Sequence, residues 1–388
     1  MDFSPSAQQD AIRQAVAQLC SRFGDEYWLA RDEDGVFPHE FHAAMAADGW
    51  LGICVPEEYG GSGLGVQDAA VMMRAVAESG AGMSGASAVH INVFGLNPVL
   101  VYGSEEQKRR MLPPMVEGRE KACFAVTEPN TGLNTTQLKT RAVRRNDRYV
   151  VDGQKVWIST AQVADKVLLL ARTTPLEEVK KPTHGLSLFY TDLDRTRVDI
   201  RKIDKMGRHC VDSNELFIEG LEIPFEDRIG EEGRGFEYIL HGMNPERVLI
   251  AAEAVGIGHL AIARASAYAR ERTVFNRPIG QNQGVQFPLA KCWAGLEAAW
   301  LVTLSAAWQY DAGLNSAAAA NAAKYLAGEA GFEACQTAVM THGGFGYAKE
   351  YHVERYLREV MIPRIAPVSP QLCLSYIAER VLGLPKSY

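Results

Sequence analysis

The sequence has few of the features that mark disulfide-bonded, metal-binding, nucleic-acid-binding or membrane proteins. Its seven cysteines are spread singly over 388 residues without a Cys-x-x-Cys pair, which indicates free thiols in a reducing compartment and offers no zinc-ligand spacing. The net charge of −7 argues against a nucleic-acid partner, because such proteins usually present a basic surface. No apolar run approaches about 20 residues, so we expect no membrane span.

The N-terminus also lacks the marks of a secretory signal. Met1–Pro5 has neither a basic start nor an apolar stretch, so we expect a cytoplasmic protein, although a processed matrix protein would look the same. With 47% apolar and 22% charged residues, the composition is that of an ordinary globular protein. A chain of 388 residues is long for one compact core, and we expect two or three structural units.

Residue patterns divide the chain into helical, β and helical regions. The first region predicts helices over 7–19, 38–48, 66–78 and after Ser104, with glycine-rich loops over 60–63 and 80–85. In the second, runs of β-branched and aromatic residues predict strands of an antiparallel sheet or barrel, with a turn at Asp152-Gly153. These runs cover 123–126, 140–143, 148–151, 155–159, 167–171 and 186–191, and alanine-rich helices are expected over 248–272, 285–310 and 317–340. The predicted domains span residues 1–120, 121–231 and 232–388.

Two segments of the β region suit a planar aromatic ligand. The first runs from Phe124 into a loop of turn-forming residues, which can offer backbone N–H groups and the Thr127 hydroxyl to an acceptor-rich ring. The second, Gly153 to Ser159, carries Trp157 on a strand, where the indole can cover one face of such a ring. Taken singly, each segment is more often an ordinary turn or a buried aromatic.

Two further segments suit a phosphate-bearing ligand. Arg272, Phe275 and Gln283 follow one another where two expected helices meet, and Gln336 precedes the glycine-rich run 341–347. Glycine permits a close approach of backbone to a pyrophosphate, and arginine neutralises its charge. The glycine run has neither the spacing nor the preceding strand of a Rossmann motif.

From about residue 35 to its C-terminus the chain resembles the acyl-CoA dehydrogenase family. The family's T-E-P-x-x-G, G-x-K-x-W-I-[ST], R-x-x-F-G-x-x-I-x-x-x-Q and G-G-x-G-Y motifs occur in order. The resemblance implies FAD as cofactor and a mainly helical fold. It further implies an N-terminal helical domain, a middle antiparallel β domain, a C-terminal four-helix bundle, and a homotetramer built as a dimer of dimers.

The resemblance also implies roles for individual residues. The residues expected around the isoalloxazine ring of FAD are Phe124, Val126, Thr127, Trp157, Ile158 and Ser159. Those expected to reach the FAD of a neighbouring subunit are Arg272, Phe275 and Gln283, and those expected at the adenosine–diphosphate end are Gln336, Gly343, Gly344 and Gly346. Ser369 and Gln371 are two further expected contacts with the cofactor. Asn276 stands where the family usually has glycine. Leu133-Asn134 replaces a common Ser-Asp, which implies the loss of a hydrogen bond near the thioester chain.

The catalytic base is expected on an early helix. Much of the family places this glutamate in a C-terminal Tyr-Glu-Gly-Thr segment, but Pro367 occupies that position, and no carboxylate occurs between Glu359 and Glu379. Glu246 instead matches the arrangement of isovaleryl-CoA and long-chain acyl-CoA dehydrogenases. We expect Asn244 to be an N-cap and Glu246 to lie in the first helical turn, where the helix N-terminus and Arg247 favour its charge. The alternative is that Glu246 is only a favourable first-turn acid.

The expected reaction is the α,β-dehydrogenation of an acyl-CoA to the trans-2-enoyl-CoA, with an electron-transferring flavoprotein as acceptor. Pro367 has no N–H to polarise the thioester carbonyl, and Ala366 in place of a bulky tyrosine would leave room for branching of the acyl group. The alternatives are an oxidase that uses O₂ and a non-catalytic flavoprotein that binds acyl-CoA or DNA. The sequence leaves the acyl chain and the natural electron acceptor open.

Overall fold

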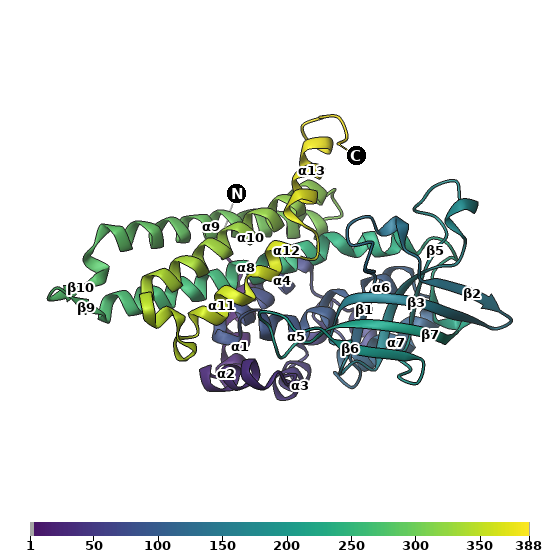
Figure 1. Ribbon diagram of the computed structural model, residues 1–388, viewed down its shortest axis with the longest axis horizontal. Coiled ribbons are helices and arrows are strands. Elements are labelled where there is room, and N and C mark those ends of the chain that lie inside the picture. Colours follow the sequence, from purple (N-terminus) through teal and green to yellow (C-terminus); the bar gives the residue numbers. More distant parts are fainter. Residues whose placement is uncertain (1–3, 388) are drawn as a thin grey trace.

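The computed structural model describes residues 4–387, and the predicted order of a helical, a β and a second helical region is confirmed (Figure 1). Met1–Phe3, which carry part of the argument against a secretory signal, lie outside the described residues. The α-helices of the first region are α1 (Ala7–Cys20), α2 (Asp25–Asp34), α3 (His39–Ala47), α4 (Val66–Val76), α5 (Gly82–Phe94), α6 (Asn97–Tyr102) and α7 (Glu105–Val116). The domain boundaries at residues 120 and 231 stay predictions.

Helices α1 and α7 begin with the same local device. The hydroxyls of Ser6 and Ser104 accept the N–H of the residue three positions on, Gln9 and Gln107, whose side chains accept the serine N–H in return. Such a capping box satisfies backbone donors that the helix itself leaves unpaired. The helix starts predicted from these two serines are therefore confirmed.

The glycine-rich loop predicted over residues 80–85 is shorter than expected, because α5 already begins at Gly82. The chain breaks from helical geometry in a kink between α4 and α5, where Gly80 has a φ of 101°, a conformation that glycine allows without steric cost. The buried Arg355 donates to the Gly80 carbonyl, and its ion-pair partner Glu359 accepts the N–H and hydroxyl of Ser84. The kink is held by partners far away in the sequence, so the local residues could not reveal these contacts.

The β region forms one sheet with the strand order β6-β7-β3-β2-β4-β5-β8. Strand β1 pairs with β4 in parallel, and β2 meets β4 in parallel at one residue pair, whereas the other neighbours are antiparallel. The sheet is therefore mixed, whereas an antiparallel sheet was expected. Strands β6 to β8 were not predicted from the sequence. The strands are β1 (Ala122–Ala125), β2 (Arg141–Arg145), β3 (Arg148–Ser159), β4 (Lys166–Arg172), β5 (Leu186–Asp192), β6 (Val198–Lys202), β7 (Ser213–Pro224) and β8 (Arg228–Ile229).

The turn predicted at Asp152-Gly153 is also wrong, because β3 runs through it as one strand. The register against β7 shifts between Val151 and Gly153, which marks a β-bulge. Gly153 has a φ of 156°, and a Cβ there would lie 2.5 Å from Oγ1 of Thr140. Glycine is required at this position by close packing against the neighbouring chain segment.

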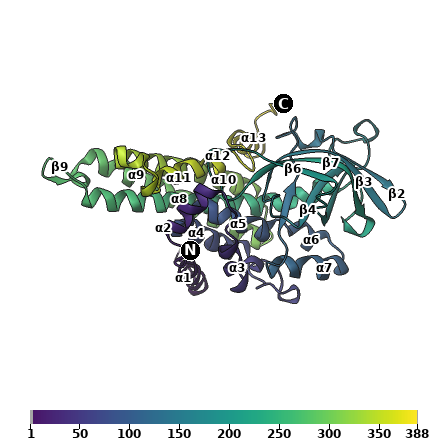
Figure 2. The same ribbon diagram turned by 60° about the horizontal axis from the view of Figure 1, so that its bottom comes forward.

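The last region is a helical bundle of three long helices with a fourth row of short ones. Helices α11 and α12 pack on both α8 and α10, and α13 packs on α10 (Figures 1 and 2). Of the described helices, α8 alone is long and apolar enough to cross a membrane, and 83% of its most apolar stretch is buried inside the protein, as in a core helix. The bounds are α8 (Gly235–Glu271), β9 (Thr273–Val274), β10 (Arg277–Pro278), α9 (Gln283–Asp311), α10 (Ala317–His342), α11 (Val353–Glu359), α12 (Met361–Ile365) and α13 (Pro370–Arg380).

The helix start predicted at Asn244 is wrong. Helix α8 begins at Gly235 after the N-cap residue Arg234 and continues through Pro245. A proline inside a helix costs a backbone hydrogen bond, but α8 is buried along most of its length, and tertiary packing supplies most of the stability of such a helix. Glu246 therefore lies well inside the helix, so the predicted help from a helix N-terminus does not apply.

Candidate active site

A buried ion pair joins the two segments predicted to hold an aromatic ring. The Lys155 side chain is fully buried, and its Nζ donates to the carbonyls of Val126 at 2.9 Å and Leu170 at 2.8 Å and to Oε1 of Glu128 at 3.1 Å. Burial lowers the pKa of Lys155 to about 8, partly opposed by Glu128. Burial would raise the pKa of Glu128, but the charge of Lys155 and the hydrogen bonds from residues 139 and 140 hold it below its usual value. The pair fixes the loop after β1 against β3.

Trp157 projects from an irregular part of β3. Its φ of 62° falls where the register against β7 shifts, and 59% of its surface is exposed. The neighbouring Val156 N–H donates to the Thr127 carbonyl at 2.9 Å, which draws the two predicted ring contacts together. A bulky residue with positive φ is uncommon and marks strain that is often functional. The strand thus presents an uncovered indole beside the Thr127 loop.

The other predicted ring contacts divide between surface and core. Phe124 is half-buried, and Val126 packs in the core beneath the sheet. The Ile158 side chain is buried in the core of the β region, so only its backbone can face a ligand. The Ser159 hydroxyl accepts a hydrogen bond from Nη2 of Arg208 at 3.3 Å.

Arg208 connects the β region to α5. Its Nη1 donates to the Ser87 hydroxyl at 3.0 Å while Nη2 reaches Ser159. Burial lowers the pKa of Arg208, and its Nε has no hydrogen-bond partner among the described residues. A cation is therefore held next to a residue predicted to contact the flavin.

Glu246 lies in a buried acidic cluster. It is 6% exposed, and its Oε1 is 3.9 Å from Nε2 of His90 on α5. Nδ1 of the same ring bonds to Glu253, which lies seven residues later on α8 and is 0% exposed. Oε2 of both glutamates is buried and has no partner in the part of the chain that the structure describes. Each glutamate therefore keeps one oxygen free for another group.

A row of aromatic contacts leads from this cluster to the predicted ring site. The His90 ring lies 4.8 Å from that of Phe94, and Phe94 lies 5.8 Å from Phe124. Phe124 belongs to the first predicted flavin segment. The structure therefore brings Glu246 and that segment to the same side of α5.

Arg247, a predicted substrate contact, is fixed by hydrogen bonds within α8. Its Nη1 donates to the Met243 carbonyl at 3.0 Å and to the Asn244 side chain at 3.2 Å. Burial raises the pKa of the Cys373 thiol on α13, although Lys324 and Arg247 beside it act in the opposite direction. The start of α13 therefore lies close to the segment of α8 that carries Glu246.

The loop before α13 and the first turn of that helix hold the remaining residues predicted near the C-terminus, Ala366, Ser369 and Gln371. Ala366 ends α12 and is half-buried, whereas Pro367 is exposed. The Ser369 hydroxyl accepts the Leu372 N–H and caps α13, and Gln371 is exposed in its first turn. Leu133 is 58% exposed in the loop after β1. The structure shows no contact between Leu133 and the residues around Arg247.

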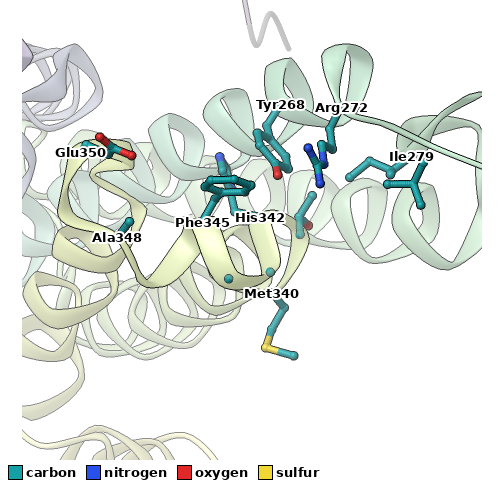
Figure 3. Close-up of a pocket in the computed structure, with 12 residues that line it drawn as sticks. Tyr268, Arg272, Ile279, Met340, His342, Phe345, Ala348 and Glu350 are labelled. Carbon is teal, nitrogen blue, oxygen red and sulfur yellow. The ribbon is translucent and has the colours of Figure 1, made fainter.

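Two of the residues predicted at the diphosphate end, Gly343 and Gly344, border a groove at the end of the bundle next to the β9–β10 hairpin. Figure 3 shows Tyr268 and Arg272 of α8 beside His342 and Phe345, with which they line a cavity of about 610 Å³. The rings of Tyr268 and His342 stack with their centres 4.3 Å apart. The guanidinium carbon of Arg272 lies 5.5 Å from the Phe345 ring centre, and Arg272 forms no ion pair with any carboxylate between residues 4 and 387. Gly343 and Gly344 line the same groove with open space where a Cβ would stand.

Gly346 and Gln336 are placed differently. A Cβ on Gly346 would lie 2.3 Å from the Val339 carbonyl oxygen, so packing against α10 explains this glycine without any ligand. Gln336 is exposed on α10 and does not line the groove. The groove therefore collects Arg272, Gly343 and Gly344 but not the whole predicted set.

The hairpin beyond α8 explains the departure at Asn276. Phe275 and Asn276 connect β9 to β10 with φ angles of 51° and 61°, as a two-residue turn of this kind requires. Asparagine tolerates this conformation, so it can stand where the family has glycine. Phe275 is 94% exposed in the same unfavourable region, and Gln283 is exposed at the start of α9.

The two groups of predicted FAD contacts lie far apart in one chain. The β9–β10 hairpin forms one extremity of the molecule, and the sheet that carries Trp157 lies beyond the other end of the bundle (Figures 1 and 2). In one chain the two groups therefore lie at opposite ends of the molecule (Figure 1). The expectation that Arg272, Phe275 and Gln283 serve a neighbouring subunit stays a prediction.

Sequence reasoning missed His90, Glu253, Arg208, Lys324 and the Lys155–Glu128 pair. One signal was available: Glu253 follows Glu246 by seven residues, which returns to the same helix face. His90 and Arg208 reach the site from α5 and from the loop between β6 and β7, and no spacing in the sequence connects them to Glu246.

A helical, β, helical chain with an uncovered indole beside a Thr-Glu-Pro loop has the scaffold of a flavin-dependent oxidoreductase. Family models for the acyl-CoA dehydrogenase N-terminal, middle and C-terminal domains match residues 6–119, 123–221 and 233–382. The chain belongs to the acyl-CoA dehydrogenase family.

Relatives in sequence and solved structures match most or all of the chain. Acyl-CoA dehydrogenase FadE12 of Mycobacterium tuberculosis is 35% identical, covering 100% of this chain and 99% of the relative. The caffeyl-CoA reductase-Etf complex subunit CarC of Acetobacterium woodii is 34% identical over 85% of this chain and 86% of its own. A glutaryl-coenzyme A dehydrogenase–glutaryl-CoA complex superposes with a TM-score of 0.95 at 28% identity, covering 100% of this chain and 98% of that one. The FAD complex of PigA gives 0.93 at 26% identity, with coverages of 99% and 100%.

FAD is the cofactor of this enzyme, and the residues present fit it. The exposed Trp157 indole and the Thr127 loop suit a flat ring. The Arg272 guanidinium without a carboxylate partner and the open glycines of the groove suit a diphosphate. The individual contacts stay predictions.

Removing Lys155 should destabilise the protein strongly. Lys155→Met leaves Glu128 buried without its cation, which should cost about 3–5 kcal/mol of unfolding free energy, measured from denaturant unfolding. Arg148→Met, on the same strand β3, is the control. It breaks the exposed ion pair between Arg148 and Glu222 of β7 and should cost at most about 1 kcal/mol of unfolding free energy. Equal losses of unfolding free energy in Lys155→Met and Arg148→Met would contradict the structural role of the buried pair.

Proposed function

We propose that the protein oxidises an acyl-CoA thioester to the trans-2-enoyl-CoA, with Glu246 taking the proton from the α-carbon. The observation that carries this proposal is the position of Glu246: a buried carboxylate with a free oxygen, connected through His90 and Phe94 to the Phe124 segment. A general base must lie within reach of the proton that it removes and must exclude competing water. Bound FAD would accept the hydrogen of the β-carbon as hydride.

The surrounding residues fix the geometry for this transfer. Lys155 and Glu128 hold the Thr127 loop and the Trp157 strand in one position, and orientation of this kind contributes largely to catalysis. Arg247 is tied to the α8 backbone at Met243, which limits its movement beside the acyl group. Pro367 has no N–H to give, so the backbone N–H of Val368 is the proposed donor to the thioester carbonyl. Ala366 and the exposed Leu133 would contact the acyl chain.

Glu253 is the rival base, because it lies on the same face of α8. Its side chain is completely buried and already bound to His90, whereas Glu246 keeps a slight exposure and only a distant contact with that ring. The more accessible carboxylate is the better base, and we assign the proton transfer to Glu246.

We propose an electron-transferring flavoprotein as the electron acceptor, because the relative CarC is named as part of a complex with Etf. The oxidase alternative would release hydrogen peroxide during aerobic turnover, which a peroxide assay measures directly. No feature of the structure favours the DNA-binding alternative. The cytoplasmic location stays a prediction.

We also propose a homotetramer in which the hairpin of one subunit completes the FAD site of another. Helix α9 exposes large apolar side chains, of which Phe287, Leu301 and Trp308 recur at multiples of seven residues and share one helix face with exposures of 61%, 47% and 55%. An apolar stripe of this size on a surface marks a protein interface. The same stripe runs along the helix that follows the β9–β10 hairpin.

Replacing the proposed base should stop the reaction without releasing the cofactor. Glu246→Gln should keep FAD and lower the rate of anaerobic flavin bleaching by about 10²–10⁴-fold, measured by stopped-flow absorbance with acyl-CoAs of varied length and branching. Glu237→Gln, at an exposed glutamate of the same helix, should bleach normally. Normal bleaching in Glu246→Gln would transfer the role of base to another residue.

Charging the stripe on α9 should separate the subunits and weaken FAD binding together. Leu301→Lys/Trp308→Lys places two cations in the proposed interface, so the mass measured by light scattering should fall and FAD should be lost on gel filtration. Gln14→Lys, on the exposed face of α1, should change neither property. A variant that becomes monomeric while retaining all its FAD would refute the shared cofactor site.

A further inference from the structure

His90 stands between two buried carboxylates of one helix. Glu246 and Glu253 are seven residues apart on α8, so both face α5, where His90 enters between them. Nε2 of His90 is 3.9 Å from Glu246, and Nδ1 bonds to Glu253. The three side chains are 13%, 7% and 0% exposed for His90, Glu246 and Glu253, respectively, so little water screens their charges.

The histidine in this position is a cation. Burial alone would lower the pKa of His90, but the charges of Glu253 and Glu246 and the hydrogen bond with Glu253 raise it to about 10. An imidazolium therefore separates two carboxylates that would otherwise repel each other in a dry site. The cluster carries a net charge of about −1 when both acids are ionised.

Other charged groups approach the cluster from the remaining sides. Arg208, from the loop between β6 and β7, lies within electrostatic reach of Glu253 but donates to Ser87 and Ser159. Lys324 of α10 lies within reach of Glu246 with its Nζ buried and unpaired among residues 4–387, and burial lowers its pKa. Arg247 turns back to the α8 backbone. None of these cations has a direct contact with either carboxylate.

The rest of α5 adds no competing charge. Arg355 and Glu359 of α11 form a closed pair against its first turn. His42 of α3 bonds to Asn92, and burial lowers the pKa of His42 to about 4, so this imidazole is neutral at ordinary pH. His90 is therefore the one cation within 4 Å of the Glu246 carboxylate in the described part of the chain.

We propose that His90, anchored by Glu253, is a positioning residue that orients the Glu246 carboxylate and keeps it ionised while the acyl group displaces water from the site. This inference rests on the proposed function of Glu246 as base. During the reaction the α-carbon–hydrogen bond breaks, its proton forms an O–H bond on Glu246, and its electron pair becomes the second bond between the α- and β-carbons. The β-hydrogen would leave with the electron pair of its own bond, as hydride to bound FAD. The His90–Glu253 pair keeps its own proton throughout, and Glu246 gives up the proton it took to water once the enoyl product has left.

The test compares pH profiles of flavin reduction in the FAD-loaded enzyme. In His90→Asn the acid limb should move to higher pH by about one pH unit or more, because Glu246 has lost the cation in contact with it. At a fixed pH on that limb the rate then falls about tenfold for each pH unit that the limb moves. Glu253→Gln should not move the limb to higher pH, because it removes an anion from the cluster while His90 keeps its proton at the low pH of that limb. His259→Asn is the matched control. It removes another histidine of α8, whose Nε2 lies 3.1 Å from Oε1 of Glu297, and it should leave the pH profile unchanged.

A second measurement reads the charge of His90 without turnover. In enzyme labelled with ¹⁵N-histidine, the His90 ring should remain an imidazolium until the pH approaches about 10, and in Glu253→Gln it should lose its proton at clearly lower pH. If His90→Asn does not fold, the His90 spectra of the wild type and of Glu253→Gln decide. An unshifted acid limb in His90→Asn or a neutral His90 overturns this proposal, whereas a wild-type enzyme that no acyl-CoA bleaches overturns the proposed function itself.

Discussion

The buried contact between Lys155 and Glu128 is the interaction on which the site depends. Both residues belong to motifs that were read as ligand-binding, yet their own side chains face inward and hold those motifs together. A charge so deep in a protein is tolerated only with full compensation, and the carbonyls of Val126 and Leu170 supply it. Because Lys155 fixes β3 from below, the same strand can turn Trp157 outward without shifting. The buried ion pair therefore determines how the indole is presented at the surface.

The position of Glu246 depends on the path of α5 as much as on α8. The kink at Gly80, held by Arg355 and Glu359, directs α5 across α8 so that His90 meets the two glutamates. Neither helix would place the cluster alone. The catalytic proposal and the fold are therefore connected through one kink whose glycine and charged partners lie more than two hundred residues apart.

The sequence sufficed for the order of elements, the caps at Ser6 and Ser104, and the family, because these depend on local patterns and ordered motifs. It failed where distant partners override local preference: Pro245 inside α8 and the bulge at Gly153 both read locally as breaks. The candidate residues within the motifs could be predicted because the motifs themselves are local, and their roles stay predictions. His90 and Arg208 were missed because only tertiary structure brings α5 and the β6–β7 loop to the base, although the seven-residue spacing of Glu253 was readable.

The distance between Trp157 and the hairpin at Phe275 has a genetic consequence in the proposed assembly. A chain damaged at Trp157 still offers an intact hairpin, and a chain damaged at Arg272 still offers an intact indole. When two such chains assemble together, some cofactor sites draw only on undamaged parts. Two alleles, each inactive by itself, would then complement one another in the same cell, whereas two alleles damaged at the same end would not.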